Sequence, residues 1–268
     1  MTETHRWIWI TGASSGIGRA FAEEAARRGA RLVLSGRDAD RLALAARACR
    51  ESGAPEAHPL PFDLADPDPA VPTLAARTVE QLAGGAPDIL VNNAGLGQRG
   101  AALETDAETE RRLFAVNYFG PTALTRAVLP GMIARGRGRV AAVTSLLAKF
   151  GAPRRSTYAA AKHALHGWFD SLREEVRGDG VGVTLLVPGW VRTEISRRAL
   201  EAGGGAHGVD DPGQQRGLPP EECARRMWTA LARGRDEQLI GGWECLAAYG
   251  MRYCPRLTRT CLRRRGIG

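Results

Sequence analysis

Thr11-Gly12-Ala13-Ser14-Ser15-Gly16-Ile17-Gly18 follows directly on the apolar run Trp7–Ile10 and leads into a helical pattern. Glycines at this spacing allow a tight turn, a close approach of backbone N–H groups to a pyrophosphate, and close packing of the helix on the strand. No Gly-Lys-Ser/Thr follows, so the turn is not the loop of a nucleoside-triphosphate site. At a first strand–helix junction the pattern predicts dinucleotide binding by Gly12, Ser14, Ser15, Gly16, Ile17 and Gly18.

Outward from this turn, short β-like runs alternate with longer helical stretches. The predicted strands are Trp7–Ile10, Arg31–Ser35, Ile89–Val91, Val140–Thr144 and Val181–Val187, with one more within Pro55–Pro72 and a last one near Gln238–Ile240. The predicted helices are Arg19–Arg28, Arg41–Glu51, Leu74–Leu82, Thr109–Met132, Tyr158–Val176 and Pro220–Arg233. This alternation predicts an α/β fold, a Rossmann-like doubly wound parallel sheet flanked by helices, in a single domain over residues 1–268. Within it we expect a mobile substrate loop at 194–220 and a basic C-terminal extension at 242–268.

The end of the second strand indicates which dinucleotide binds. Ser35-Gly36-Arg37-Asp38 has glycine where an NAD-binding chain has an acid for the ribose, and Arg37 beside it. An arginine on a phosphate contributes about 1.5–3 kcal/mol, or about a 10- to 150-fold preference. We therefore predict NADP(H) over NAD(H). Two alternatives stay open: Arg37 is a solvated charge, or Asp38 is the ribose acid and does not cap the next helix.

A phenol and an ammonium stand four residues apart in Tyr158-Ala159-Ala160-Ala161-Lys162 and so share a helix face. Free tyrosine has a pKa of about 10, and lowering it by about three units takes roughly 4 kcal/mol, which two close positive charges supply. Tyr158 is then a general acid for reducing a carbonyl, or a general base for oxidising an alcohol. Among 37 basic residues only Lys149 and Lys162 are lysines, which singles out Lys162.

Two further strand ends bring polar residues to the same predicted edge of the sheet. Ser145 ends one β-like run, and Asn92-Asn93-Ala94-Gly95 ends another. Ligands of open α/β sheets bind at the carboxyl ends of the strands. Together with the glycine turn, these ends predict one crevice with several polar groups.

At this point the chain resembles the short-chain dehydrogenase/reductase family in its single-domain Tyr-x-x-x-Lys form, over residues 6–193. The resemblance rests on Thr11-Gly12-x-x-x-Gly16-x-Gly18, on Asn92-Asn93-Ala94-Gly95, and on Pro188-Gly189-Trp190-Val191-Arg192-Thr193. It implies the catalytic residues Asn117, Ser145, Tyr158 and Lys162. Ser145 holds the substrate carbonyl, Tyr158 transfers the proton, Lys162 holds the nicotinamide ribose and depresses the pKa of Tyr158, and Asn117 supports a relaying water. Asn117 at a helix kink and Ser145 in a turn also have plain structural explanations.

The resemblance also extends the set of cofactor-binding residues. Asp63 and Leu64 match the segment that reads the adenine ring, and the segment after the sixth strand holds the nicotinamide carboxamide. The implied set adds Asp63, Leu64, Asn93, Ala94, Gly95, Tyr158, Lys162, Pro188, Gly189, Val191 and Thr193 to the turn and Arg37.

For the substrate, Ser145, Leu147, Phe150 and Trp190 adjoin the catalytic positions and line an apolar pocket, unless the apolar three are packed in the core. A hydrophobic ketone or alcohol of steroid, retinoid or lipid type fits, as does a 3-oxoacyl thioester. Two other functions remain as alternatives: a catalytically silent NADP(H)-binding sensor or interaction protein, and a dinucleotide-using epimerase or dehydratase.

The formal net charge is +8, and six of these charges lie at the C-terminal end, in Arg252, Arg256, Arg259, Arg263, Arg264 and Arg265. The body is therefore nearly neutral, so we expect no nucleic acid as a partner. The stretch Gln215–Glu222 and the basic end resemble the member-seven branch of dehydrogenase/reductases. Leu239–Leu262 mixes aromatic and arginine residues, which suits either contact with an anionic bilayer surface or a terminal helix packed on the body.

The five cysteines form no C-x-x-C pair, and no apolar run reaches the roughly 20 residues of a membrane span. We therefore expect a cytoplasmic enzyme, peripheral to a membrane at most, and no bound metal. The alanine-rich face of Tyr158–Val176, with the family's habit of pairing through this helix, predicts a homodimer or homotetramer.

Overall fold

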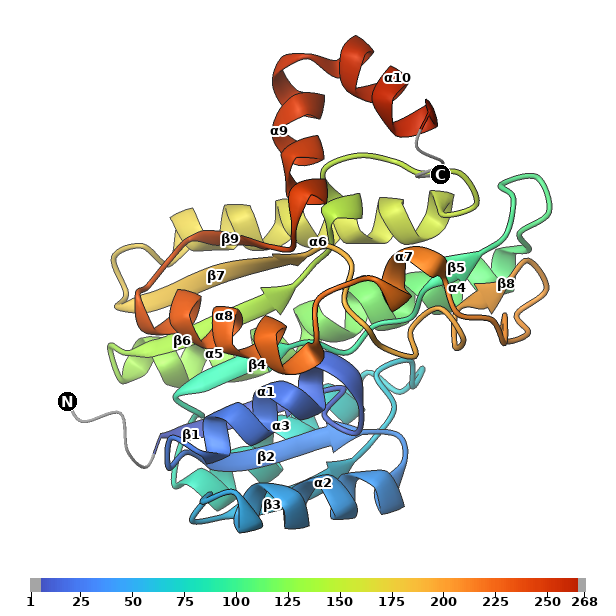
Figure 1. Cartoon of the computed structure of the whole chain (residues 1–268). Helices are drawn as coiled ribbons and strands as arrows, with labels where there is room; N and C mark the ends of the chain where they lie inside the picture. Colours follow the sequence, from blue (N-terminus) through green and yellow to red (C-terminus); the bar gives the residue numbers. More distant parts are fainter. Residues whose placement is uncertain (1–5, 265–268) are drawn as a thin grey trace.

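The computed structural model describes residues 6–264, in which seven parallel strands form one sheet (Figure 1). Along the chain the strands are β1 (Trp7–Thr11), β2 (Arg31–Gly36), β3 (Ala57–Pro61), β4 (Ile89–Asn92), β6 (Gly138–Val143), β7 (Val181–Pro188) and β9 (Glu237–Ile240). Their order in space is β3-β2-β1-β4-β6-β7-β9. The predicted doubly wound α/β fold is confirmed, and each predicted strand lies within two residues of an observed one.

Helices cover both faces of this sheet. One face holds α1 (Gly16–Ala26), α2 (Ala39–Glu51) and α8 (Pro220–Ala232); the other holds α3 (Ala70–Ala83), α5 (Gly120–Ala134) and α6 (Ser156–Glu175). The side chains of β1 alternate between the two faces. Ile8 and Ile10 pack against the first group of helices, and Trp7 and Trp9 pack against the second. Successive side chains of a strand point to opposite faces of the sheet, and here both faces are covered by a hydrophobic core. Every residue of the strand is therefore buried, which explains its continuously apolar sequence.

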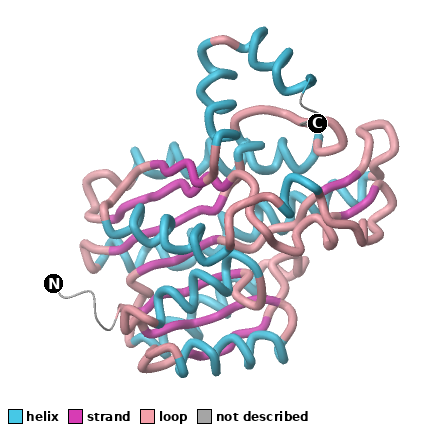
Figure 2. The backbone as a smooth tube through the Cα atoms, viewed as in Figure 1, coloured by secondary structure: helices cyan, strands magenta, loops and turns pink. Residues whose placement is uncertain are grey.

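The chain reverses its winding direction beside β1. β1 pairs with β2 on one side, where Thr11 lies opposite Ser35, and with β4 on the other, where Ile10 lies opposite Val91. The crossovers on the two sides leave in opposite directions, so the strand ends there are not covered by a connection. Loops gather at this edge of the sheet (Figure 2). Ligands of open α/β sheets bind at the edge where the winding direction reverses.

The predicted helix Thr109–Met132 is wrong in one respect. The chain forms α4 (Ala107–Phe114), a π-helical turn η1 (Ala115–Phe119) and then α5. A π-helical turn inserts an extra residue per turn and is frequent at functional sites. Asn117 lies inside η1, which places an irregularity of the backbone at a predicted catalytic position.

The segment predicted as a substrate loop contains β8 (Leu200–Glu201), which pairs with β5 (Gln98–Arg99), and the short helix α7 (Pro212–Gln215). At the other end of the chain, α9 (Leu246–Tyr253) and α10 (Pro255–Arg264) replace the single terminal helix and project from the body (Figure 1). Arg265 and the rest of the predicted extension to residue 268 lie outside the described residues. Within residues 6–264, no helix has both the length and the apolar character needed to cross a bilayer.

Candidate active site

The glycine turn has the geometry that its sequence predicts. Gly12 and Gly16 adopt φ values of +66° and +56°, which side chains other than glycine rarely adopt. A Cβ on Gly18 would lie 2.3 Å from the carbonyl oxygen of Gly12. Gly18 is therefore required by the close packing of α1 on the turn, and it does not line the cleft described below.

The end of β4 is tied to this turn by hydrogen bonds. The backbone N–H groups of Asn93 and Ala94 both donate to Thr11 Oγ1 at 3.1 Å, and Asn93 Nδ2 donates to the carbonyl oxygen of Thr11 at 2.9 Å. Thr11 and Asn93 thus fix the spacing between the two strand ends. Both strand ends line the cleft described below.

At the end of β2 the structure separates the roles of Arg37 and Asp38. Asp38 caps α2, accepting a hydrogen bond from the Arg41 backbone N–H at 3.0 Å, and it also pairs with the Arg41 guanidinium at 3.5 Å. The predicted capping role of Asp38 is confirmed, and its carboxylate is occupied. Arg37 is exposed and lines the cleft. Asp63, also on the cleft wall, accepts from the backbone N–H of Ala65 at 2.9 Å.

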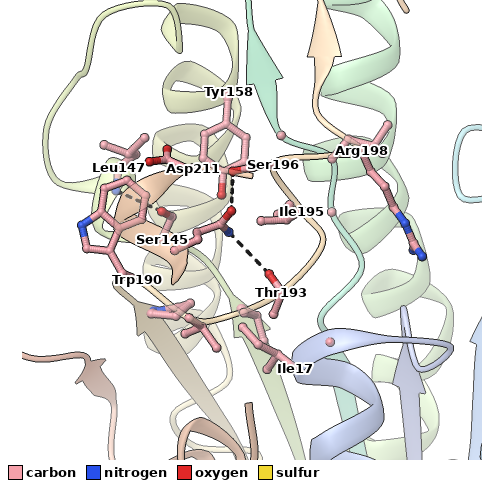
Figure 3. Close-up of a pocket in the computed structure, with 18 of the residues that line it drawn as sticks. Ile17, Ser145, Leu147, Tyr158, Trp190, Thr193, Ile195, Ser196, Arg198 and Asp211 are labelled. Atoms are coloured by element: carbon pink, nitrogen blue, oxygen red, sulfur yellow. Dashed lines mark hydrogen bonds between the residues drawn. The ribbon is translucent and has the colours of Figure 1, made fainter. Parts of the chain in front are cut away.

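Tyr158 is buried at the first turn of α6 and faces Ser145 (Figure 3). Burial raises the pKa of Tyr158, while a hydrogen bond with Ser145 and the charge of Arg155 act in the opposite direction. Ser145 also accepts a hydrogen bond from the Leu147 backbone N–H at 3.1 Å, which fixes its hydroxyl at the end of β6. Tyr158 in the ligand-free protein is therefore a neutral phenol, suited to donating a proton.

Lys162 differs from its prediction. Its Nζ donates to the carbonyl oxygen of Val143 at 3.0 Å and lies 5.9 Å from the centroid of the Tyr158 ring. Burial lowers the pKa of Lys162 to about 8. The expectation that Lys162 depresses the pKa of Tyr158 is not met in the ligand-free protein, because the ammonium points at a carbonyl and burial disfavours both charges.

Both the oxygen and the nitrogen of the Asn117 side-chain amide form hydrogen bonds with the backbone. Its Nδ2 donates to the carbonyl oxygens of Leu96 at 2.9 Å and Leu113 at 3.0 Å, and its Oδ1 accepts from the Leu96 N–H at 3.2 Å. The side chain is fully buried and does not line the cleft. Of the two explanations open at the sequence level, the structure favours the one in which Asn117 satisfies backbone groups at a helix irregularity.

The remaining predicted residues surround one cleft of about 1290 Å³ at the carboxyl ends of the strands. Its wall includes Gly12, Ser14, Ser15, Gly16, Ile17, Arg37, Asp63, Leu64, Asn93, Ala94, Gly95, Ser145, Leu147, Phe150, Tyr158, Lys162, Pro188, Gly189, Trp190, Val191 and Thr193. The fold thus brings together residues from six separate strand ends.

The C-terminal extension also contributes to this wall, which the sequence did not indicate. Ala247 of α9 and Leu262 of α10 line the cleft, and both pack with Leu146 and Phe150 in one apolar cluster. Leu147 packs against the same cluster. The predicted apolar pocket and the alternative of core packing therefore both hold, because the cluster is a small core with one side open to the cleft.

Three contacts of the segment 194–220 were missed by the sequence reasoning. Arg198 Nη1 donates to Ser15 Oγ at 3.1 Å, at the glycine turn. Gln214 is buried and links Ser196 to Thr193, to whose Oγ1 its Nε2 donates at 3.4 Å (Figure 3). Asp211 pairs with two arginines of the cleft wall, discussed below. No local signal marks these residues, since arginine supplies almost every positive charge of this chain.

Comparison with known proteins agrees with this geometry. The family model described as short chain dehydrogenase matches residues 6–203. The chain is 40% identical over 256 residues to "Dehydrogenase/reductase SDR family member 7B" of Bos taurus, an alignment covering 93% of this chain and 78% of the relative. This likeness bears out the resemblance to the member-seven branch.

Solved structures are similar over most of the chain. A short chain dehydrogenase/reductase from Burkholderia phymatum in complex with NAD has a TM-score of 0.79 at 28% identity, covering 89% of this chain and 90% of that one. A metagenomic short-chain oxidoreductase in complex with NADP has a TM-score of 0.74 at 30% identity, covering 89% and 98%. The two neighbours hold different dinucleotides, so the fold alone does not select between them.

Proposed function

This chain belongs to the short-chain dehydrogenase family and is an oxidoreductase, and we propose that it transfers hydride between NADP(H) and a hydrophobic ketone or secondary alcohol. The observation that carries the proposal is the shared cleft: Ser145 and Tyr158 open onto the same space as the glycine turn. A proton donor and a dinucleotide site in one cleft are what carbonyl reduction needs.

The residues of the turn fit a dinucleotide. The positive φ values of Gly12 and Gly16 and the start of α1 leave backbone N–H groups free to receive a pyrophosphate. When bound, NADPH supplies the hydride that reduces the carbonyl carbon. A Cβ added to Gly16 would lie 3.2 Å from the methyl group of Thr193, so Thr193 borders the opposite side of that space.

Protons move through this chain's own residues. The Ser145 hydroxyl binds the carbonyl oxygen of the substrate, and Tyr158 donates its phenolic proton to that oxygen as reduction proceeds. A pKa of Tyr158 that burial raises suits the acid role in the ligand-free protein. Lys162, with a pKa of about 8, is mostly protonated at neutral pH and donates to the hydroxyl groups of the cofactor ribose.

The preference for NADP(H) is supported by charge at the end of β2. The residue where an NAD-binding chain has an acid is Gly36, and the one neighbouring acid, Asp38, is engaged by Arg41. The exposed guanidinium of Arg37 is then available to a 2′-phosphate. Such a charge-assisted contact contributes about 1.5–3 kcal/mol.

The test is a fluorescence titration with NADPH and, separately, NADH. We expect tighter binding of NADPH, lost in Arg37→Met and kept in Arg47→Met, an exposed arginine of the same helix region that pairs with Glu51. Equal affinity for both nucleotides, or a preference that survives Arg37→Met, contradicts the role of Arg37. A Tyr158→Phe variant that reduces ketones as fast as the wild type contradicts the role of Tyr158 as proton donor. A wild-type protein that binds NADPH but reduces no ketone favours a silent NADP(H)-binding protein.

We further propose that the enzyme is cytoplasmic and lies against an anionic membrane through α9 and α10. Leu246, Tyr249 and Tyr253 recur on one face of α9 and are at least 57% exposed. The exposed arginines around them are Arg252, Arg256, Arg259, Arg263 and Arg264. This mixture suits a bilayer of anionic lipid. Co-sedimentation with phosphatidylglycerol vesicles but not with phosphatidylcholine vesicles is the expected result, and no sedimentation with either contradicts it.

The proposed assembly is a homodimer or homotetramer through α6. Ala160, Gly167 and Ser171 lie on one exposed side of that helix, where small side chains allow a close approach of a second helix. Light scattering measures the mass in solution. A monomer at all protein concentrations contradicts this part of the proposal.

A further inference from the structure

Two arginines from separate segments share one carboxylate in the wall of the cleft. Arg99 ends β5, Arg155 precedes α6, and Asp211 precedes α7. Arg155 Nη2 donates to Asp211 Oδ2 at 3.0 Å, and Arg99 Nη2 donates to the same oxygen. The other oxygen, Oδ1, accepts from the Gly213 backbone N–H at 3.0 Å. All three charged side chains are at least 83% buried, since their exposed fractions are 13%, 14% and 17%.

The charges of this trio do not balance. Two guanidinium groups face one carboxylate, which leaves one positive charge in a desolvated wall. Within residues 6–264, Asp211 is the one acid that pairs with either arginine, and the other partner of Arg99 is the neutral hydroxyl of Ser196. The neighbouring acid Asp210 pairs with Arg197. A buried surplus of positive charge is costly unless an anion joins it.

The trio lies beside the catalytic tyrosine. Arg155 precedes Tyr158 by three residues, which is one helical turn, and the backbone N–H of Tyr158 donates to Gln98 Oε1, next to Arg99, at 3.0 Å. Figure 3 shows Asp211 close to Tyr158, and Ser145 lining the same pocket. Because the two side chains are close, the charge of Arg155 acts to lower the pKa of Tyr158.

We propose that Arg99 and Arg155 form a subsite for a carboxylate of the substrate, so that the preferred ketone is an oxo acid with an apolar body. The proposal rests on the proposed function and names its substrate class. Asp211 holds the two guanidinium groups together, and the carboxylate of the substrate joins the trio as its second anion, which balances the charge. A carboxylate is the anion of choice because the protein's own occupant is one, and a forked guanidinium receives its two oxygens.

The rest of the cleft suits the remainder of such a molecule. Leu147, Phe150 and Trp190 offer apolar surface on the cleft wall for the body of the substrate. During reduction, hydride adds to the carbonyl carbon and the proton of Tyr158 goes to the carbonyl oxygen, while the carboxylate is unchanged. The subsite therefore orients the substrate and takes no part in the redox step.

The segment that carries Asp211 contains little regular structure. α7 has four residues, and the chain before it contains Gly203, Gly204, Gly205 and Gly208. Arg154, next to Arg155, has a φ of +60°, the one positive φ outside glycine among the described residues. Strain of this kind persists where the surrounding contacts hold it and is concentrated at binding sites.

The experiment compares a keto acid with its neutral ester. Benzoylpropionate and its methyl ester are titrated calorimetrically into the protein saturated with NADP⁺, and their KM values are measured with NADPH. We expect the acid to bind at least 10-fold more tightly than the ester. In Arg155→Met and Arg99→Met that preference falls by about 10- to 100-fold, as the loss of one charge-assisted contact predicts. Asp211→Asn increases it, because the surplus positive charge at the subsite grows from one to two.

Two controls separate the subsite from the fold and from the reaction. Arg225→Met removes an arginine of α8 that is 62% exposed, pairs with Glu222 and does not line the cleft, and it keeps the wild-type preference. Thermal unfolding identifies any variant that fails to fold, and the preference is then read from the other arginine and from Asp211→Asn. Equal binding of acid and ester by the wild type, or a preference that none of the three variants changes, overturns the subsite. Binding of inorganic phosphate but not of the acid overturns the choice of carboxylate.

The failure of the subsite is distinguishable from the failure of the reaction. If NADPH reduces the ester and the acid binds no more tightly than the ester, the assigned reaction is supported and the carboxylate subsite is refuted. If the acid binds with the expected dependence on Arg155 but neither compound is reduced, the subsite stands and the assigned reaction falls.

Discussion

Replacing Arg198 with methionine tests whether the segment 194–220 closes on the cofactor. Arg198 Nη1 donates to Ser15 Oγ at 3.1 Å, so its guanidinium lies at the turn that receives a pyrophosphate. A charge-assisted contact contributes about 1.5–3 kcal/mol. The Arg198 side chain is 43% exposed, which reduces that value by solvent screening to about 1–1.5 kcal/mol. Arg198→Met should therefore raise the Kd of NADPH by roughly 5- to 12-fold.

The pattern across nucleotides identifies the contact. NADH and NADPH share the pyrophosphate, so Arg198→Met should weaken both by the same factor, whereas Arg37→Met should weaken NADPH alone. Arg197→Met is the matched control, because Arg197 adjoins Arg198 but is 59% exposed and pairs with Asp210 at 3.8 Å. The assay is the fluorescence of the bound reduced nucleotide at fixed salt. An unchanged Kd in Arg198→Met, or a loss confined to NADPH, refutes the contact with the pyrophosphate.

Three further perturbations test the packing and the charges. Gly18→Ala places a Cβ 2.3 Å from the Gly12 carbonyl oxygen, which should lower the free energy of unfolding by about 1–3 kcal/mol and remove most of the NADPH affinity. The control is Gly178→Ala, because a Cβ added there meets no atom within 4 Å, and thermal unfolding compares the two variants. Hydrogen bonds from His166 and Lys149 hold the pKa of Glu237 at about 2 against an ordinary 4.5, so this pairing stabilises the fold above pH 4.5, and the stabilisation is lost as the pH falls toward 2. With a side chain 34% exposed, Glu237→Gln should lose about 1–2 kcal/mol at neutral pH, and equal acid denaturation of both proteins would contradict this. Because the pKa of Lys162 falls from 10.5 to about 8 on folding, its ammonium should contribute a rise in stability of up to roughly 3 kcal/mol between these pH values. Burial raises the pKa of Cys49 and Cys223 to about 12, so these thiols act in the opposite direction, equally in the wild type and in a Lys162 variant. Denaturant titrations of Lys162→Met should lack that rise.

The apolar patterns and the glycines of this chain determine its fold because both act locally. Alternation of side chains along β1 and the spacing of Gly12, Gly16 and Gly18 each follow from backbone geometry over a few residues. The cap of α2 by Asp38 is equally local, since it spans three residues. These features predicted the sheet, the cofactor turn and the edge at which the cleft opens. They also predicted that Tyr158 and Lys162 share a helix face.

Tertiary structure decided what those residues contact. Asn117 bonds Leu96, 21 residues away, Arg155 pairs with Asp211 across 56 residues, and Arg198 meets Ser15 across 183. Such contacts form only after the chain has packed, and no period or turn signal in the sequence encodes them. The same holds for charge: burial, which is a property of the whole fold, directs Lys162 to the Val143 carbonyl oxygen and shifts its pKa. Sequence thus determined the site's location, and packing determined its electrostatics, because desolvation depends on everything around a group.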